Sequence, residues 1–175
     1  MRTTLAIAAG LLLLVIPVHD TRAVTLQAAY DAAGPGEGYD KLLDLDKNGT
    51  YTGGLVVSTG TSCCIHGNGS MLDLEGASIE VTGFTTLDID HCILVNGFRG
   101  IYFQNSATGI VRNNTIRGNF HGVSSFYGDP NLRIENNLIV ENTRYGIYAR
   151  DGYEPFIQYN TVWGNPGGDY MENCG

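Results

Sequence analysis

The sequence predicts an all-β solenoid, a stack of turns built from short parallel strands, and three observations lead to this fold class. The chain of 175 residues contains 24 glycines, about twice the usual share, and only 16% charged residues. Twelve of its 14 asparagines follow residue 90. In that same half, Ile116, Ile139 and Val162 are spaced by a constant 23 residues. A fixed period of this length is the signature of a repeat architecture.

The first element is a predicted export signal at residues 1–23. Arg2 precedes an apolar run at residues 5–18, and small residues favour cleavage after Ala23. The run is shorter than the ~20 residues of a membrane span. We therefore expect a secreted, extracellular or periplasmic protein without a membrane span. Cleavage leaves 8 basic and 17 acidic residues, a net charge of −9, which argues against nucleic acid as a partner.

Each repeat is predicted to contain three strands, which in the clearest turn lie near residues 110–112, 115–117 and 122–125. The third strand carries a glycine–aliphatic pair whose spacing varies by one residue between turns, as expected where only an outer loop changes length. One turn earlier the alignment stays open, because either Ile93 or Leu94 can match Ile116 and His91 replaces an asparagine. The pairs are Gly100–Ile101, Gly122–Val123 and Gly146–Ile147.

Asparagines recur two residues before and three residues after each aliphatic centre of the repeat. Asparagine tolerates the left-handed backbone of a sharp bend, and stacked asparagine amides can hydrogen-bond along the axis of a solenoid. We therefore expect a structural ladder with inward aliphatic columns such as Ile134, Ile139 and Ile147. The predicted ladder residues are Asn114, Asn137 and Asn160 in one column and Asn119, Asn142 and Asn165 in the other.

The runs Ile-Val-Arg-Asn-Asn-Thr-Ile-Arg-Gly-Asn-Phe-His-Gly-Val (110–123) and Leu-Arg-Ile-Glu-Asn-Asn-Leu-Ile-Val-Glu-Asn (132–142) resemble the repeats of right-handed parallel β-helix, pectin-lyase-like exported proteins. The resemblance implies one domain over residues 24–175, a short capping helix at 26–33, roughly six rungs, and the clearest repeats at 87–170. Relatives usually continue beyond such an end. We therefore expect a truncated chain that lacks its C-terminal cap and offers an open strand edge for stacking.

The same resemblance places substrate on the sheet of glycine–aliphatic strands. Its expected outward residues there and in the preceding turns are aromatic or basic, types that stack on sugars and bind carboxylates. We expect a non-catalytic surface protein that contacts polysaccharide. The alternatives are a polyuronate lyase or another carbohydrate-active enzyme, or a purely structural adhesin segment. The candidate binding residues are Tyr102, Tyr145, Tyr148 and Arg150, beside Phe98, Phe120 and Ser124, and the candidate catalytic residues are Arg99, His121 and Arg144.

The sequence offers few other candidates for metal binding, catalysis or disulfide formation. Asp129 and Asp151 could share a Ca²⁺ ion but more simply form Asp-Pro and Asp-Gly turns, and no other cofactor is expected. Asp88 and Asp90 could act as a carboxylate pair near His91, yet the polygalacturonase signatures are missing. Of the four cysteines, Cys64 and Cys92 are the preferred candidates for a disulfide in an exported protein.

Overall fold

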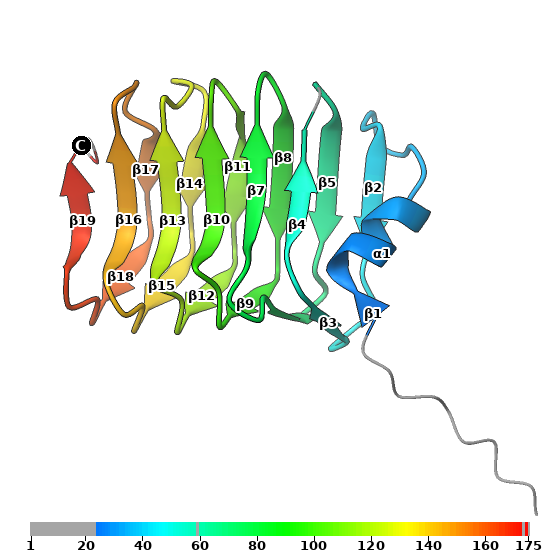
Figure 1. Cartoon of the computed structure of the whole chain (residues 1–175), viewed down its shortest axis with the longest axis horizontal. Coiled ribbons are helices and arrows are strands. Elements are labelled where there is room, and N and C mark those ends of the chain that lie inside the picture. Colours follow the sequence, from blue (N-terminus) through cyan, green and yellow to red (C-terminus); the bar gives the residue numbers. More distant parts are fainter. Residues whose placement is uncertain (1–23, 59, 173, 175) are drawn as a thin grey trace, which may run out of the picture.

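Over the residues that the structure describes, the chain folds into a parallel β-helix of six turns, each with three strands (Figure 1). The computed structural model describes residues 24–58, 60–172 and 174. The predicted export signal, residues 1–23, lies outside the described residues. The fold class, the number of turns and the short N-terminal helix agree with the sequence prediction.

Three parallel sheets form the walls of the stack. Sheet 1 holds the first strand of each turn: β2 (Lys41–Asp44), β5 (Ser62–His66), β8 (Thr86–Asp90), β11 (Thr108–Arg112), β14 (Arg133–Glu135) and β17 (Phe156–Gln158). Sheet 2 holds the second strands, preceded by β1 (Val24–Thr25): β3 (Thr50–Thr52), β6 (Met71–Asp73), β9 (Ile93–Val95), β12 (Thr115–Arg117), β15 (Leu138–Val140) and β18 (Thr161–Trp163). Sheet 3 holds the third strands: β4 (Leu55–Val57), β7 (Ser78–Thr82), β10 (Arg99–Gln104), β13 (His121–Phe126), β16 (Tyr145–Arg150) and β19 (Gly168–Glu172).

Aliphatic columns between the three sheets form the core. Ile116, Ile139 and Val162 are direct partners on neighbouring strands of sheet 2, so the 23-residue period is the register of the stack. Ile134 and Ile139 are fully buried, and so is nearly every inward aliphatic side chain of the middle turns. Strand alternation explains this arrangement, because every second residue of each strand points inward.

A helix covers the N-terminal end of the stack. Helix α1 (Leu26–Ala32) begins at Thr25, whose Oγ1 accepts a hydrogen bond of 3.1 Å from the Ala28 backbone N–H. Such a cap satisfies one of the free donors of the first helical turn. Leu26 is fully buried and attaches the helix to the core, and α1 lies against β4 and β2. The helix ends where Ala33 becomes extended ahead of Gly34 and Pro35.

Two hydrogen-bonded columns of asparagine run inside the stack. In the first, Asn137 Oδ1 accepts from the backbone N–H and Nδ2 of Asn114 at 3.0 and 3.2 Å, and Asn160 does the same for Asn137. In the second, Asn119, Asn142 and Asn165 are joined in the same way. The carboxylate of Asp169 closes the second column by accepting from Asn165.

The bend and the ladder use different residues, which corrects the sequence prediction. The left-handed conformation belongs to the residue before each first-column asparagine, as at Asn113 and Asn136, both with φ of 56°. One turn earlier Leu94, not Ile93, pairs with Ile116, and His91 is therefore the bend residue. The ladder position of that turn falls on Cys92, whose backbone N–H donates to Asn114 Oδ1 at 3.0 Å.

All four cysteines are free thiols, and the expected bridge between Cys64 and Cys92 is not formed. Strand alternation gives the reason. Cys63 and Ile65 point into the core from β5, so Cys64 between them lies on the outer side of the strand. Cys92 is itself a core residue, 1% exposed, whose Sγ donates to the Asp90 carbonyl oxygen. The two thiols therefore lie on different sides of the wall.

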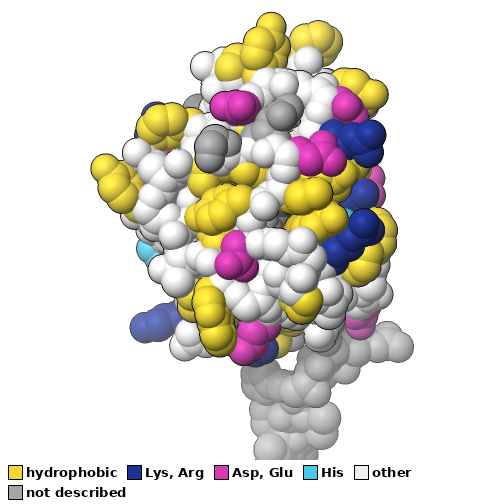
Figure 2. All heavy atoms as spheres, turned by 90° about the vertical axis from the view of Figure 1, so that its left-hand side faces the viewer, with side chains coloured by type: hydrophobic (Ala, Val, Ile, Leu, Met, Phe, Trp, Pro, Cys, Tyr) yellow, Lys and Arg dark blue, Asp and Glu magenta, His cyan; other side chains and the backbone are white. Residues whose placement is uncertain are grey.

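The C-terminal end of the stack ends in strand edges. β17, β18 and β19 are the last strands of sheets 1, 2 and 3. Figure 2 looks onto this end and shows hydrophobic side chains among acidic ones. This last turn exposes three large hydrophobic side chains, Phe156, Tyr159 and Trp163, with exposed fractions of 48, 78 and 66%.

Candidate functional site

The outer surface of sheet 3 gathers most of the chemically interesting side chains. On β10, Ile101 and Phe103 point into the core, so Tyr102 between them points outward. The register places Ser124 of β13 and Tyr148 of β16 in the same outward row. We call this surface the aromatic–arginine face; its members are Phe98, Arg99, Tyr102, Phe120, His121, Phe126, Arg144, Tyr145 and Tyr148.

The rings of this face are in contact across three turns, those of β10, β13 and β16. Phe126 lies edge-on between Tyr102 and Tyr148, with ring centroids 5.3 and 5.1 Å away. The imidazole of His121 stacks on Tyr145 at 5.1 Å, and an interplanar angle of 16° makes the two rings nearly parallel. Contacts of this geometry contribute about 0.5–1.5 kcal/mol each beyond the burial of their area. The rings therefore hold each other in fixed positions.

Two arginines lie over these rings. The Arg99 guanidinium carbon is 4.0 Å from the centroid of Tyr102, and that of Arg144 is 4.9 Å from Tyr145. Within the described part of the chain, neither guanidinium has a carboxylate within ion-pair distance. Arg99 Nε is also buried without a hydrogen-bond partner. Two unpaired positive charges on a protein of net charge −8 attract anions locally.

His121 lies at the centre of the face and is only 3% exposed. Burial, with the positive charges of Arg99 and Arg144 acting in the same direction, lowers its pKa to about 4. The imidazole is therefore neutral at neutral pH. Its Nδ1 and the hydroxyl of the fully buried Ser124 have no hydrogen-bond partner among the described residues. Unpaired buried polar atoms are rare in folded proteins and cluster where a function requires them.

Arg150 lies on the same side of β16 but does not share this free charge. Its Nε is 2.9 Å from Asp151 and 3.7 Å from Glu172. Tyr148 also donates a hydrogen bond to Glu172. Of the predicted binding residues, Tyr102, Tyr145 and Tyr148 thus join the unpaired arginines, whereas Arg150 is neutralised by two carboxylates.

The two aspartates considered for calcium are occupied by other partners. Asp129 Oδ1 accepts from the backbone and side chain of Asn131 within its own turn, both at 2.8 Å. Asp151 is paired with Arg150. Over residues 24–58, 60–172 and 174, no group of three or more His, Cys, Asp or Glu side chains is arranged to hold a metal ion.

A second polar cluster, on the outer side of sheet 1, surrounds the carboxylates considered as a pair near His91 and adds His66, Arg112 and Cys64 to them. Asp90 accepts from His66 Nδ1 at 3.3 Å, His91 Nδ1 at 3.0 Å and the Arg112 guanidinium at 3.2 Å. Burial opposes ionisation of Asp90, but these hydrogen bonds outweigh it and lower the pKa. The signal was present in the sequence, because His66, Asp90 and Arg112 are direct register partners at the same end of three neighbouring strands.

In this cluster the thiol of Cys64, the imidazole of His66 and the carboxylate of Asp90 lie next to one another in that order. The Cys64 Sγ lies 3.6 Å from His66 Nε2, which also contacts Glu37 at 3.2 Å. Burial raises the pKa of Cys64 to about 11, and the nearby carboxylates of Asp88 and Asp90 act in the same direction. The sulfur therefore stays a thiol at neutral pH, whereas a nucleophilic cysteine requires a thiolate.

The carboxylates of Asp88 and Asp90, considered as a catalytic pair, are both hydrogen-bonded within this cluster. Asp88 accepts from the Tyr39 hydroxyl at 2.6 Å and from the Ile110 backbone N–H at 2.8 Å. Asp90 accepts hydrogen bonds from two imidazoles and one guanidinium. Both carboxylates therefore join neighbouring turns of the stack. The cluster therefore stabilises the wall of the stack, and the aromatic–arginine face remains the stronger candidate site.

Residues 42–175 match the family described as the right-handed β-helix region. Comparison with curated proteins and with solved structures gave no significant match. No helix within the described residues is long and apolar enough to cross a membrane.

Proposed function

The chain belongs to the right-handed β-helix family, and on this scaffold we propose that it binds acidic polysaccharide through the aromatic–arginine face without cleaving it. The observation that carries the proposal is the pair Arg99 and Arg144, which lie over aromatic rings and have no carboxylate partner among the described residues. Guanidinium groups fork onto carboxylates, and aromatic rings stack on the apolar faces of sugars.

The spacing of the stack supports a linear ligand. Arg99, His121 and Tyr145 follow one another on adjacent strands in one row, and Tyr102, Ser124 and Tyr148 form the next row. Adjacent parallel strands are about 4.8 Å apart, close to the length of one pyranose unit. A chain laid across the strands therefore meets Arg99 or Tyr102 on β10, the ring of Phe126 on β13, and Tyr145 or Tyr148 on β16.

The residues around this face favour binding of the polysaccharide without its cleavage. Hydrolysis of a glycosidic bond requires two carboxyl groups at the substrate. Glu80 is the one carboxylate in the Tyr102–Tyr148 row of β4, β7, β10, β13 and β16. Glu172, which accepts a hydrogen bond from Tyr148, lies on β19 and is paired with Arg150. The carboxylates of Asp88 and Asp90 lie on sheet 1.

The proposal is tested by titrating a soluble polyuronate and a neutral glucan into the mature protein. We expect the polyuronate to bind and the affinity to fall with added salt. Tyr148→Ala and Arg144→Ala should each lower the affinity about tenfold, the loss of one stacking or charge-assisted contact. Tyr153→Ala and Arg117→Ala remove the same residue types elsewhere and should leave it unchanged. Equal binding by all four variants would refute the proposed face.

A polyuronate lyase is the second candidate, because His121 is a neutral imidazole between two arginines. β-Elimination needs a base at C5 of the uronate and a cation beside its carboxylate. Turnover of polyuronate that disappears in Arg144→Ala while the fold stays intact would favour the lyase.

Export belongs to the same proposal. The basic residue, apolar run and small residues of the N-terminal 23 residues support secretion with cleavage near Ala23. N-terminal sequencing of protein collected outside the producing cells should begin at Val24. A product that still starts at Met1 inside the cells would contradict export.

A further inference from the structure

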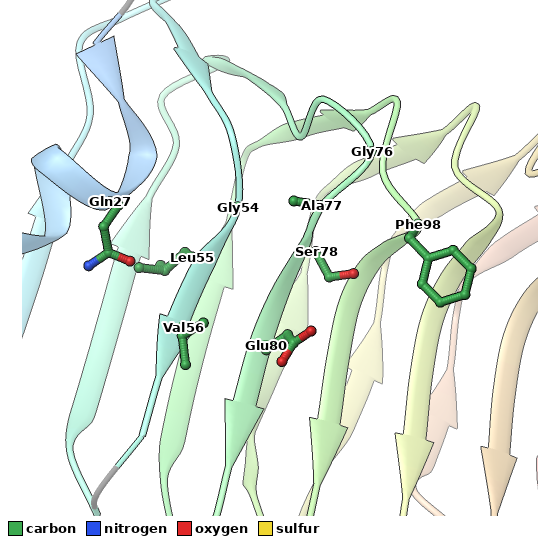
Figure 3. Close-up of a pocket in the computed structure, with 9 residues that line it drawn as sticks. All are labelled: Gln27, Gly54, Leu55, Val56, Gly76, Ala77, Ser78, Glu80 and Phe98. Carbon is green, nitrogen blue, oxygen red and sulfur yellow. The ribbon is translucent and has the colours of Figure 1, made fainter.

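A trough lies beside the aromatic–arginine face, between α1 and the ring of Phe98. It encloses about 360 Å³, within the range of small-ligand sites. Figure 3 shows Gln27 of α1 on one side, Phe98 on the other, and residues of β4 and β7 between them. None of the trough residues except Phe98 belongs to the face described above.

Small residues make the trough hollow. Gly54, Gly76 and Ala77 precede β4 and β7 and line it where other turns carry larger side chains. A side chain at Gly54 would collide with the turn above, because its Cβ would lie 2.7 Å from the Ser78 carbonyl oxygen and 2.8 Å from the Ala77 Cβ. Gly54 therefore permits the close approach of two turns, whereas a Cβ at Gly76 would meet nothing within 4 Å and would project into open space.

The trough differs from the neighbouring face in charge. Glu80 is its one charged lining residue, and no ion pair to it exists in the described structure. Glu80 is aligned with Tyr102 on the next strand, and Ser78 with Arg99. The sign of the charge thus changes from negative to positive between adjacent strands. An acidic sugar suits the arginines, but its carboxylate would face Glu80 if it entered the trough.

The trough is also the last position on this side of the sheet. β4 is the terminal strand of sheet 3, and α1 lies next to it and lines the trough through Gln27. A glycan that follows the row of arginines toward β4 therefore meets the helix after the trough. The sugar unit that occupies the trough is therefore the terminal unit of the glycan.

We infer that the trough is a subsite for one uncharged sugar unit at the end of an acidic glycan, an inference that rests on the proposed function of the adjacent face. Phe98, 47% exposed, provides the stacking surface, and its ring joins the face through Phe120 at 5.2 Å. The Glu80 carboxylate accepts from sugar hydroxyl groups, and the Gln27 amide, whose Nε2 already donates to Asp31 at 2.8 Å, offers its oxygen and its second N–H. A terminal uronate is disfavoured by Glu80.

The test uses two sets of defined oligosaccharides, each with four uronate units and a fifth terminal unit, prepared with that unit at either end. In one set the fifth unit is a neutral hexose and in the other a uronate. Calorimetry should show about tenfold tighter binding of one neutral-ended isomer, the contribution of a hydrogen bond to a charged group. Glu80→Gln should reduce this preference by improving the uronate-ended ligand, whereas Glu154→Gln, an exposed loop control, should preserve it.

The outcomes separate the two proposals. Equal affinity for both sets, unaffected by Glu80→Gln but lost in Tyr148→Ala, would overturn the trough and leave the face standing. Failure of every oligosaccharide to bind folded wild-type protein would overturn the proposed function and the trough together. A neutral-end preference that survives Gln27→Ala and Glu80→Gln would place the terminal unit elsewhere. Thermal melting of each variant checks that the fold is intact.

Discussion

Replacing Asn137 by alanine should destabilise the stack, because this side chain serves three turns at once. Its Oδ1 accepts from Asn114, and its Nδ2 donates to Asn160 Oδ1 at 2.9 Å and to the Val111 carbonyl oxygen at 2.8 Å. The residue is 2% exposed, so solvent does not replace these partners directly. In Asn137→Ala the buried backbone N–H of Asn114 loses its acceptor.

The magnitude follows from that orphaned donor. An unsatisfied buried donor costs about 1–3 kcal/mol, so we expect a loss of about 2 kcal/mol in the free energy of unfolding. For a chain of this size, 1 kcal/mol corresponds to a shift of about 2–4 °C in Tm, so the predicted fall is about 4–8 °C. Thermal melting followed by circular dichroism near 218 nm, together with urea unfolding, measures both quantities.

Two further variants make the result specific to the ladder. Asn160 lies at the more exposed end of the column, so water can replace part of its role and Asn160→Ala should cost less than Asn137→Ala. Asn131 bonds only within an exposed turn, and Asn131→Ala should change stability by less than about 0.5 kcal/mol. An Asn137→Ala protein that melts with the wild type would show that buried amides do not hold the turns together.

Two other predictions concern packing and pH. Gly122→Ala should destabilise the fold by about 1–3 kcal/mol. An added Cβ would lie 2.5 Å from the Gly146 carbonyl oxygen and 2.6 Å from the Ile139 side chain. Gly34→Ala serves as the control in the same thermal melts, because a Cβ there would meet nothing within 4 Å. Stability should be highest near pH 6.5. Burial lowers the pKa of His66, but hydrogen bonds to Glu37 and Asp90 outweigh it and raise the pKa above 6.5, so its contribution is lost as the pH rises through that raised value. His121 has its pKa lowered to about 4, so its contribution is present above pH 6.5 and lost as the pH falls toward 4. Urea unfolding across this range should show that His66→Gln flattens the alkaline limb and His121→Gln the acid limb; unchanged limbs would contradict the assignment.

The sequence revealed the stack because its repeat is a physical requirement. Side chains on neighbouring turns touch only if register is kept, so Ile116, Ile139 and Val162 retain a constant spacing and become direct strand partners. The alignment stayed open between Ile93 and Leu94 where the spacing drops to 22 residues, because at Cys92 the ladder is continued by a backbone N–H instead of an asparagine side chain. A backbone donor leaves no residue type to recognise in the sequence.

Only part of the candidate site could be predicted from the sequence. Strand alternation places Tyr102 and Tyr148 on one outer row, and the structure brings them together around Phe126. Burial of His121 and the missing carboxylate partners of Arg99 depend on how side chains pack across three turns, which the repeat alone does not specify. The trough was missed for a similar reason, since small residues such as Gly76 and Ala77 indicate a hollow only when their neighbours in space are known.

The most direct test of the proposed function follows both binding and chain length when polyuronate is incubated with the folded mature protein, with and without Ca²⁺. Our account predicts that polyuronate cosediments with wild-type protein, that Tyr148→Ala lowers the bound fraction, and that the chain length stays constant in either buffer. Shortened chains would make the protein an enzyme and direct attention to Arg99, His121 and Arg144. Polyuronate that remains unbound by folded protein would contradict the account.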